Sequence, residues 1–483
     1  MVMTYEYFST IKTVYMIGIK GAGMVALAEL LHTKGIVVSG SDVAERFFSD
    51  PILQKLHIPY AETFDPKNIP AKVDLVIYST AYSAQNNAEV AAALERSLPM
   101  VSYPEALGLL MKEKFSIAVC GTHGKTTTTA LAAHVLACGD KDPSAIVGSA
   151  VMGWNGGARV GKGQYFVVEA DEYQNKFFHY HPMAAIVTNV DWDHPDFFPT
   201  FASYKDSFSH FLRRIPPHGF IIACGDDADV ADVVRAAQCT VLTYGFSREC
   251  DFIISAPEQH REEGKIIQRF SVFHEGEKYG TFNLPLVGRH NMSNATAVIA
   301  LAFKLGIPPA AVREGVETFR GTARRFEQRG TFEGATLIDD YAHHPAEIVA
   351  TLTAAREAYP DRKIWAVFHP HTFSRTEALK EEFVQSFDSA DYVLLLDIYP
   401  SARENGGTIG SGDLARAINA YVPQKAVHTP TIADAVELLR REVREGSVII
   451  TLGAGDVWRV HEYLTKIKNP DAMKESHDVK NTP

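Results

Sequence analysis

The sequence is poor in the features that mark secreted, membrane-spanning or nucleic-acid-binding proteins. Only five of its 483 residues are cysteine, an odd number without C-x-x-C spacing, which favours free thiols in a reducing compartment. No run of about 20 apolar residues is present, so we predict no membrane insertion. Positive charge is also scarce, because 47 Lys and Arg face 58 Asp and Glu, for a net charge of -11. That balance argues against nucleic acid or an anionic membrane as a partner.

The N-terminus also lacks a long apolar segment followed by a cleavage site. Polar residues run directly into the strand-like "VYMI" and a glycine turn. We therefore expect a soluble, cytoplasmic protein whose phosphate-bearing ligands are held by local loops and helix ends. The sequence carries no signal for an oligomeric state.

What the chain does have is length and a repeated α/β pattern. With 483 residues, of which 46% are apolar, it can form three domains of roughly 100 to 200 residues each. Short buried strands alternate with helices, and the strands end in polar or glycine residues, which predicts parallel sheets. We expect an α/β protein with a Rossmann-like domain over residues 1–110, a central P-loop domain over 111–323 and a Rossmann-like C-terminal domain over 324–483.

The first α/β unit opens on a glycine turn, "GIKGAG", with glycines at positions 18, 21 and 23. Their G-x-x-G-x-G spacing departs from the G-x-G-x-x-G fingerprint of dinucleotide-binding turns. Two interpretations remain open on this evidence. The turn either faces a ligand or is a tight βα connection that binds nothing.

A second glycine turn, "GTHGKTTTT", follows the apolar "FSIAVC" and precedes a helical pattern. The standard phosphate loop G-x-x-x-x-G-K-S/T would need a glycine at position 119, where this chain has Val119. The shorter loop from Gly121 to Thr126 can still cradle phosphate oxygens with its backbone N–H groups and the helix N-terminus. Lys125 would neutralise the β and γ charges, and Thr126 would offer a hydroxyl to Mg2+.

Polar side chains end the next two strand patterns. Glu169 ends "YFVVE" and His194 ends "AAIVTNVDWDH". Because ligands of α/β sheets gather beyond the carboxyl ends of strands, we expect both residues near the phosphate loop. Mg2+ would stabilise the Glu169 carboxylate, and the alternative is a solvated strand end. His194 could ligate a second Mg2+ or hydrogen-bond its water. Since Mg2+ prefers oxygen ligands, the alternative is a helper or a satisfied core histidine.

Histidines also gather in the third α/β block. Zinc ligation and the lining of a polar cleft are both open interpretations, and the absence of an accompanying cysteine favours the cleft. The residues concerned are His343, His344, His369 and His371.

Taken together and in order, eight segments resemble those of the Mur ligases of peptidoglycan synthesis. They are "GTHGKTTT", "EADE", "NVDWDH", "GRHNMSNA", "TARRFE", "DDYAHHP", "FHPHTFSRT" and "TLGAGD". The short loop is similar to that of the Mur and folylpolyglutamate ligases, which activate a carboxylate with ATP and then form an amide. A folylpolyglutamate-type ligase normally begins close to the loop, whereas about 110 residues precede it here. Within the family, the most similar member joins L-alanine to UDP-N-acetylmuramate.

The resemblance implies an ATP- and Mg2+-dependent ligase and suggests which residues bind each group. ATP would contact the loop residues Gly121, Thr122, His123, Gly124, Lys125, Thr126 and Thr127. The adenine and ribose sides would be His290, Asn291, Asn294 and Asp340. Magnesium would be held by Thr126, Glu169 and His194. The catalytic set would be Lys125, Glu169, His194 and Arg325, the last also on the ATP side.

The same resemblance assigns the other two substrates, UDP-N-acetylmuramate and L-alanine. The UDP diphosphate would face Gly18, Gly21 and Gly23, and the amino acid would occupy a pocket built by Tyr341, His343 and Arg375.

Two departures from the family pattern bear on substrate choice. Many alanine-adding members read E-A-D-E-S-D where this chain has Tyr173 and Gln174, and a tyrosine there also resembles the ligase that recycles muropeptides. Other Mur ligases carry a carbamylated lysine where Phe208 stands, three residues after Lys205, so we predict none here. The recycling ligase and a non-enzymatic, nucleotide-switched sensor of UDP-sugars remain the alternatives.

Overall fold

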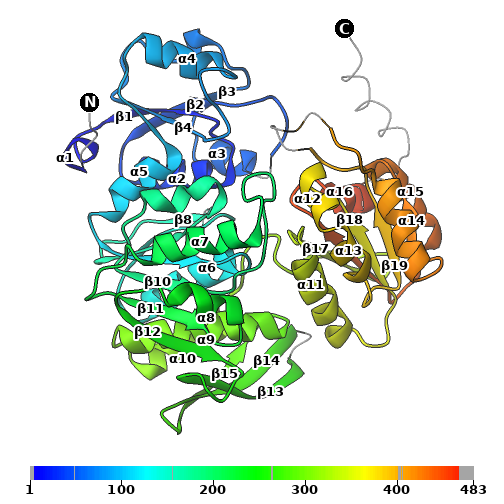
Figure 1. The fold of residues 1–483 in the computed structure, drawn as a ribbon. Helices are drawn as coiled ribbons and strands as arrows, with labels where there is room; N and C mark the ends of the chain where they lie inside the picture. The colour runs from blue at the N-terminus through cyan, green and yellow to red at the C-terminus, as the bar shows by residue number, and fades with distance from the viewer. Residues whose placement is uncertain are drawn as a thin grey trace. The chain divides into compact units, whose positions relative to one another are not determined.

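The computed structural model describes residues 5–47, 49–154, 156–262, 265–400, 404 and 406–466 (Figure 1). The chain divides into two compact units, Met1–Ala323 and Arg324–Pro483. The first unit contains two sheets and the second contains one, and each sheet is rich in parallel strand pairs. The predicted α/β class is therefore confirmed.

The N-terminal sheet has five strands in the order β3-β2-β1-β4-β5, and its described strands all pair in parallel. The strand order reverses beside β1, and the first glycine turn follows the carboxyl end of that strand, which is where such sheets bind ligands. The elements are α1 (Tyr5–Phe8), β1 (Thr13–Ile17), α2 (Ala22–Thr33), β2 (Val37–Ser41), α3 (Asp50–Lys55), β3 (Tyr60–Ala61), the 3-10 helix η1 (Pro66–Asn68), β4 (Leu75–Tyr78), α4 (Ala88–Glu95), β5 (Met100–Ser102) and α5 (Tyr103–Met111).

The central sheet has ten strands in the order β15-β14-β13-β12-β11-β10-β6-β9-β7-β8. Its middle strand β6 (Phe115–Cys120) is buried almost throughout, as its apolar sequence predicts, and leads into the phosphate loop and α6 (Lys125–Cys138). The elements that follow are β7 (Ser144–Ile146), β8 (Ala158–Arg159), β9 (Tyr165–Glu169), the 3-10 helix η2 (Tyr173–His179), β10 (Ala184–Val187), α7 (Phe201–Leu212), β11 (Phe220–Cys224), α8 (Ala228–Val234) and β12 (Thr240–Gly245).

An antiparallel extension completes one side of this sheet. The extension consists of the long strands β13, β14 and β15, which pair antiparallel in this order, and two helices follow them in the chain (Figure 1). These elements are β13 (Phe252–Glu262), β14 (Lys265–His274), β15 (Glu277–Leu284), α9 (Arg289–Lys304) and α10 (Pro309–Thr318).

The second unit holds a six-stranded sheet in the order β16-β17-β21-β18-β19-β20. Only the pairing of β16 with β17 is antiparallel among its described strands. Its elements are β16 (Glu327–Phe332), β17 (Ala335–Asp340), α11 (Pro345–Ala358), β18 (Ile364–Phe368), α12 (Phe373–Ala378), α13 (Lys380–Gln385), β19 (Tyr392–Leu395), α14 (Ser411–Tyr421), β20 (Ala426–His428), α15 (Ile432–Glu442), β21 (Val448–Leu452) and α16 (Arg459–Lys466).

Two expectations from composition can be compared with this fold. All five cysteines are free thiols, as their odd number predicts. Within the described ranges, no helix combines the length and apolar character needed to cross a membrane.

Candidate active site

The phosphate loop depends on glycine at two positions. Gly121 has φ 131°, and a Cβ added there would lie 2.1 Å from Thr188 Oγ1. Gly124 has φ 80°, and its added Cβ would lie 2.7 Å from Asn294 Oδ1. Both backbone conformations disfavour other residues, and both positions are closely packed. The shortened loop is therefore a specific backbone structure between β6 and α6.

Lys125, the first residue of α6, is held inside this loop. Its Nζ donates to the carbonyl oxygens of Gly121 at 2.6 Å and Thr122 at 2.9 Å, and pairs with Glu172 Oε2 at 2.9 Å. Burial alone would lower the pKa of Lys125, but Glu172, Asp171 and other acids outweigh it and raise the pKa. The lysine is therefore a fixed positive charge at the N-terminus of a helix.

Glu172 was missed by the sequence analysis. Its side chain is only 1% exposed, and its Oε1 accepts a hydrogen bond from Tyr204 at 2.9 Å. The available signal was the last acid of "EADE", which lies beyond the end of β9. A buried carboxylate needs a cation and a donor, and Lys125 and Tyr204 supply both.

The structure brings Thr126 and Glu169 together, as the sequence predicts for strand ends. The Thr126 hydroxyl donates to the two carboxylate oxygens of Glu169 at 3.0 and 3.1 Å. The backbone N–H of Gly148 donates to Glu169 Oε2 at 2.8 Å and fixes its orientation. Hydroxyl and carboxylate oxygens are ligands that Mg2+ prefers, so these two residues fit a magnesium site.

His194 lies on the same side of the site but approaches a different acid. Its Nε2 is 4.0 Å from Glu172 Oε1. Strand β10 ends at Val187, so His194 belongs to the loop that follows rather than to the strand end, which corrects the sequence interpretation. Local interactions fix the conformation of this loop. His194 has a left-handed backbone with φ 56°, and its backbone N–H donates to Asp193 Oδ1 at 2.7 Å.

Tyr173, one of the two residues that depart from the E-A-D-E-S-D pattern, packs on this histidine. The rings of Tyr173 and His194 are stacked, with centroids 4.3 Å apart. The Tyr173 hydroxyl donates to Asp196 at 2.6 Å. The tyrosine therefore orients His194 from one face. The other departure, Gln174, has a left-handed backbone with φ 57°.

The remaining loop residues make contacts that stiffen the turn. Thr122 Oγ1 donates to the carbonyl of Asp191 at 2.8 Å, and the His123 N–H donates to Asn189 Oδ1 at 2.8 Å. Thr127 is buried in α6. These bonds join the loop to the segment after β10.

The predicted adenine-side residues lie at the start of α9. Asn294 Nδ2 donates to Asn291 Oδ1 at 3.2 Å, and Asn291 Nδ2 donates to the carbonyl of Val287 at 2.8 Å. Both asparagines are buried, and Asn294 lies against Gly124. His290 is exposed.

The position of the carbamylated lysine of other Mur ligases is apolar in this chain. Phe208 is fully buried in α7. Lys205 pairs with Asp229 at 3.0 Å and with Asp232 at 3.3 Å. Its ammonium group is thus engaged by acids of helix α8.

The N-terminal glycine turn is crowded by aromatic rings. A Cβ at Gly18, which has φ 82°, would lie 2.7 Å from the Tyr82 ring, and one at Gly23 would lie 2.6 Å from the Tyr103 ring. At Gly21 the nearest atom would be 3.5 Å away. The neighbouring Lys20 was not predicted from the sequence, and its buried Nζ pairs with Asp50 at 3.2 Å.

In the second unit, the two arginines of "TARRFE" differ in role. Arg324, which the sequence analysis did not single out, is buried, pairs with Asp339 at 3.0 Å and donates to the Gly453 carbonyl at 2.7 Å. The predicted Arg325 is 27% exposed and lies 3.8 Å from Glu347. Arg324 therefore ties strands together, and Arg325 retains an accessible guanidinium group.

Asp340 ends β17 and is buried. Burial raises its pKa to about 6, although Arg325 and backbone N–H donors act in the opposite direction. Its two oxygens accept from the N–H groups of Ala342 and Phe326, both at 2.8 Å.

The residues expected to bind the amino acid lie in the loop after β17 and in helix α12, which follows β18. His343 Nδ1 is 3.0 Å from the Tyr341 carbonyl, and the His343 and His371 rings are 6.2 Å apart. Arg375 is 3% exposed in α12, and its Nη1 donates to the His371 carbonyl at 3.1 Å. The Arg375 side chain is therefore buried in α12 and is not a solvated surface cation.

Two other histidines of this block have local partners. His344 Nδ1 accepts from the Ala346 N–H at 3.3 Å and caps α11. His369 is buried, with its Nδ1 3.6 Å from Asp456. His344 therefore has a structural role at the start of α11.

Comparison with known sequence families covers nearly the whole chain. The Mur ligase family catalytic domain matches residues 13–115, the Mur ligase middle domain matches 119–302, and the Mur ligase glutamate ligase domain matches 324–455.

Individual relatives and solved structures agree with these matches. A protein of Desulfitobacterium hafniense named UDP-N-acetylmuramate--L-alanine ligase is 42% identical over 93% of this chain and 99% of its own. One of the same name from Caldanaerobacter subterraneus is 38% identical over 93% and 96%. The crystal structure of the UDP-N-acetylmuramate-alanine ligase of Thermotoga maritima superposes with a TM-score of 0.80 at 27% identity, covering 96% of this chain and 99% of its own. A murein peptide ligase of Psychrobacter arcticus shares the fold, with a TM-score of 0.71 at 24% identity over 95% and 100%.

Proposed function

The chain belongs to the Mur ligase family, and from this premise we propose that it joins L-alanine to the lactyl carboxylate of UDP-N-acetylmuramate with cleavage of ATP. The reaction would be a cytoplasmic step of peptidoglycan precursor synthesis. Relatives that carry this activity in their name align with 93% of the chain, across both compact units, which supports the whole reaction rather than a single binding module.

One observation carries the proposal. Lys125 is a largely shielded, charged lysine at the N-terminus of α6, with 13% of its side chain exposed, and the next residue, Thr126, contacts the Glu169 carboxylate. A helix N-terminus and a lysine stabilise phosphate, while the hydroxyl and carboxylate suit a divalent cation. This arrangement is suited to ATP with Mg2+, and we assign the metal to Thr126 and Glu169, with His194 close by.

The chemistry proceeds in two balanced steps. A lactyl carboxylate oxygen attacks the γ-phosphorus of ATP, ADP leaves, and an acyl phosphate forms. The amine of alanine then attacks the acyl carbon, inorganic phosphate leaves, and a proton is released. Bound magnesium would supply neutralisation of the phosphate charge.

The residues of the chain contribute position and charge to these steps. Lys125 stabilises negative charge on the transferred phosphoryl group, and the backbone of Gly121 to Gly124 orients the phosphates. Asn291, Asn294 and Asp340 would contact the nucleoside. For the amino acid, Arg375 offers a planar guanidinium that suits a carboxylate and would leave the amine free to react.

Two other functions remain to be tested. The recycling ligase would accept a peptide in place of alanine, and Tyr173 is the residue that favours it. A sensor of UDP-sugars would bind nucleotide without forming product. The glycine turn that follows β1 is compatible with either.

The deciding experiment is a coupled assay of phosphate release together with product analysis by mass spectrometry. The purified chain is given ATP, Mg2+ and UDP-N-acetylmuramate with alanine, glycine, serine or the muropeptide L-alanyl-γ-D-glutamyl-diaminopimelate. We expect the highest kcat/KM with alanine. Preference for the peptide would favour the recycling reaction, and nucleotide binding without any product would favour the sensor.

A further inference from the structure

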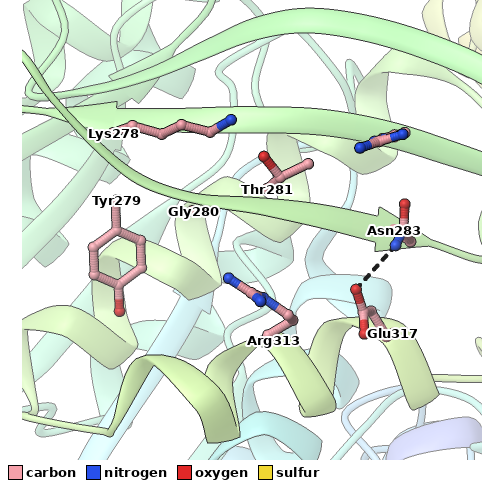
Figure 2. Close-up of a pocket in the computed structure, with 8 residues that line it drawn as sticks. Lys278, Tyr279, Gly280, Thr281, Asn283, Arg313 and Glu317 are labelled. Carbon is pink, nitrogen blue, oxygen red and sulfur yellow. Dashed lines mark hydrogen bonds between the residues drawn. The ribbon is translucent and has the colours of Figure 1, made fainter.

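A basic pocket lies at the outer end of the central sheet, far along the strand order from the phosphate loop. It is formed by β14, β15 and α10 and has a volume of about 510 Å3 (Figure 2). Strand β15 is the last in the order, and strands β14 to β10 separate it from the loop strand β6. The ligase reaction proposed above uses none of the residues that line it.

Three cations line this pocket, Arg269, Lys278 and Arg313, and all three are exposed. In the described part of the chain, none of them forms an ion pair or side-chain hydrogen bond. The carboxylate in the lining, Glu317, already accepts a hydrogen bond from Asn283 at 3.1 Å. Like charges repel one another, so three cations around one cavity are most stable with an anion between them. The chain as a whole carries a net charge of -11, whereas the lining of this pocket is positively charged.

The pocket is lined from strands and from a helix. Figure 2 shows Arg313 reaching from α10 toward β15, while Lys278 lies along the strand on the other side of Gly280 and Thr281. Glycine at position 280 keeps the space open, because an added Cβ would lie 3.1 Å from the Phe282 ring and 3.9 Å from Arg313 Nη2. The hydrogen bond from Asn283 to Glu317 fixes the helix against the strand.

We propose that the basic pocket binds a small phosphorylated anion, with Arg269, Lys278 and Arg313 as its charged contacts. The volume lies within the range of roughly 300 to 1,000 Å3 that is usual for small-molecule sites. Guanidinium groups match phosphate oxygens with paired N–H donors, and lysine adds a point charge. Three positive charges exceed what one carboxylate neutralises and suit a diphosphate.

Isothermal titration with inorganic pyrophosphate tests this site. The full-length chain carries Lys125→Ala and Glu172→Gln, so that binding at the phosphate loop is weakened equally in every sample. Into this background we introduce Arg269→Gln or Arg313→Gln. The matched control is Lys265→Gln, an exposed cation of β14 outside the pocket. Thermal melting checks that each variant is folded.

We expect saturable binding that each pocket substitution weakens about tenfold or more and the control leaves unchanged. Added KCl should weaken binding in the parent chain. ADP is titrated in parallel, because tighter binding of ADP through the same arginines would indicate a nucleotide, whereas equal affinity would indicate recognition of the phosphates alone. Absence of saturable binding, or equal affinity in the pocket and control variants, would overturn the proposal.

Discussion

At the scale of single residues, the pairing of Lys125 with Glu172 makes the phosphate loop both a functional and a structural element. The lysine side chain is 13% exposed and the glutamate 1% exposed. Removing the lysine alone leaves a buried carboxylate without its cation, which costs about 3 kcal/mol or more. We expect Lys125→Ala to lose both ligase activity and thermal stability. The loss of stability follows from the ion pair with Glu172, which holds the largely shielded lysine in place.

A second variant separates these two effects. Lys125→Ala combined with Glu172→Gln removes the unpaired charge, so it should recover most of the lost stability while remaining inactive. Thermal melting and phosphate release are measured for both variants and for Glu172→Gln alone. Substantial turnover in a folded Lys125→Ala chain would contradict the role of the lysine in ATP chemistry.

Asp340 gives a prediction with a definite pH direction. Its pKa is about 6 in the folded chain against an ordinary value of 3.8, so the folded state holds the proton more tightly than the unfolded state. The resulting stabilisation is complete below about pH 4 and is lost as the pH rises through about 6. The difference in stability between Asp340→Asn and the natural chain should therefore shift in favour of the variant by about 1 kcal/mol per pH unit between pH 5 and 6. Paired melting curves at pH 5 and above measure it, and a constant difference would show that Asp340 titrates normally.

Arg375 tests amino-acid recognition. Replacing it with lysine exchanges a guanidinium fork for a point charge, so we expect alanine binding to weaken by about 1 to 3 kcal/mol. Michaelis constants for alanine, ATP and UDP-N-acetylmuramate are compared in Arg375→Lys and Arg375→Ala. Since Arg375 also bonds to His371, a purely structural role would raise all three constants together or lower the melting temperature. Only a selective rise for alanine supports the assignment.

At the scale of elements, the connection from β6 to α6 is the most constrained part of the site. We expect Gly121→Ala to abolish ATP binding and to destabilise the first unit, because a Cβ there would lie 2.1 Å from Thr188 Oγ1 in a backbone with φ 131°. Adding Thr188→Ala removes that oxygen but leaves the Asn189 carbonyl 2.9 Å from the new Cβ. The double variant should therefore recover only part of the stability, as measured by melting and nucleotide titration. Full recovery would mean that the backbone conformation itself imposes little constraint.

The elements that sequence predicts well are those with a simple period or a glycine requirement. The buried strand over Phe115–Cys120, its loop and its helix follow from an apolar run, two glycines and a lysine. The contact of Thr126 with Glu169 follows from the rule that parallel strand ends meet at one edge. The positions of Glu172 and His194 are harder to predict from sequence. Both residues lie in or beside loops with left-handed residues, and Glu172 is buried against Tyr204, which comes from α7. No local pattern encodes that pairing.

At the scale of the whole molecule, the net charge is negative, but positive side chains lie at the proposed binding sites. The chain carries -11 overall, yet two shielded cations follow strand ends: Lys125, 13% exposed at the start of α6, and Arg375, buried in α12. The charge of Lys125 is offset locally by Glu172, and the guanidinium of Arg375 donates to the His371 carbonyl. Net charge therefore predicts the absence of a general affinity for polyanions, while local geometry decides where phosphate and carboxylate groups bind.

The proposed reaction requires ATP, UDP-N-acetylmuramate and alanine. An oxygen-18 label can follow the carboxylate oxygen that is transferred to phosphate in this reaction. If the lactyl carboxylate attacks ATP directly, one of its oxygens must leave with phosphate when alanine attacks the acyl carbon. UDP-N-acetylmuramate labelled with oxygen-18 in that carboxylate should thus yield one labelled oxygen in inorganic phosphate per amide formed, measured by mass spectrometry. Phosphate release should be negligible without the sugar nucleotide, because Lys125 and the loop act on a phosphoryl group that has no acceptor. Unlabelled phosphate, or equal release without the sugar nucleotide, would instead identify simple ATP hydrolysis.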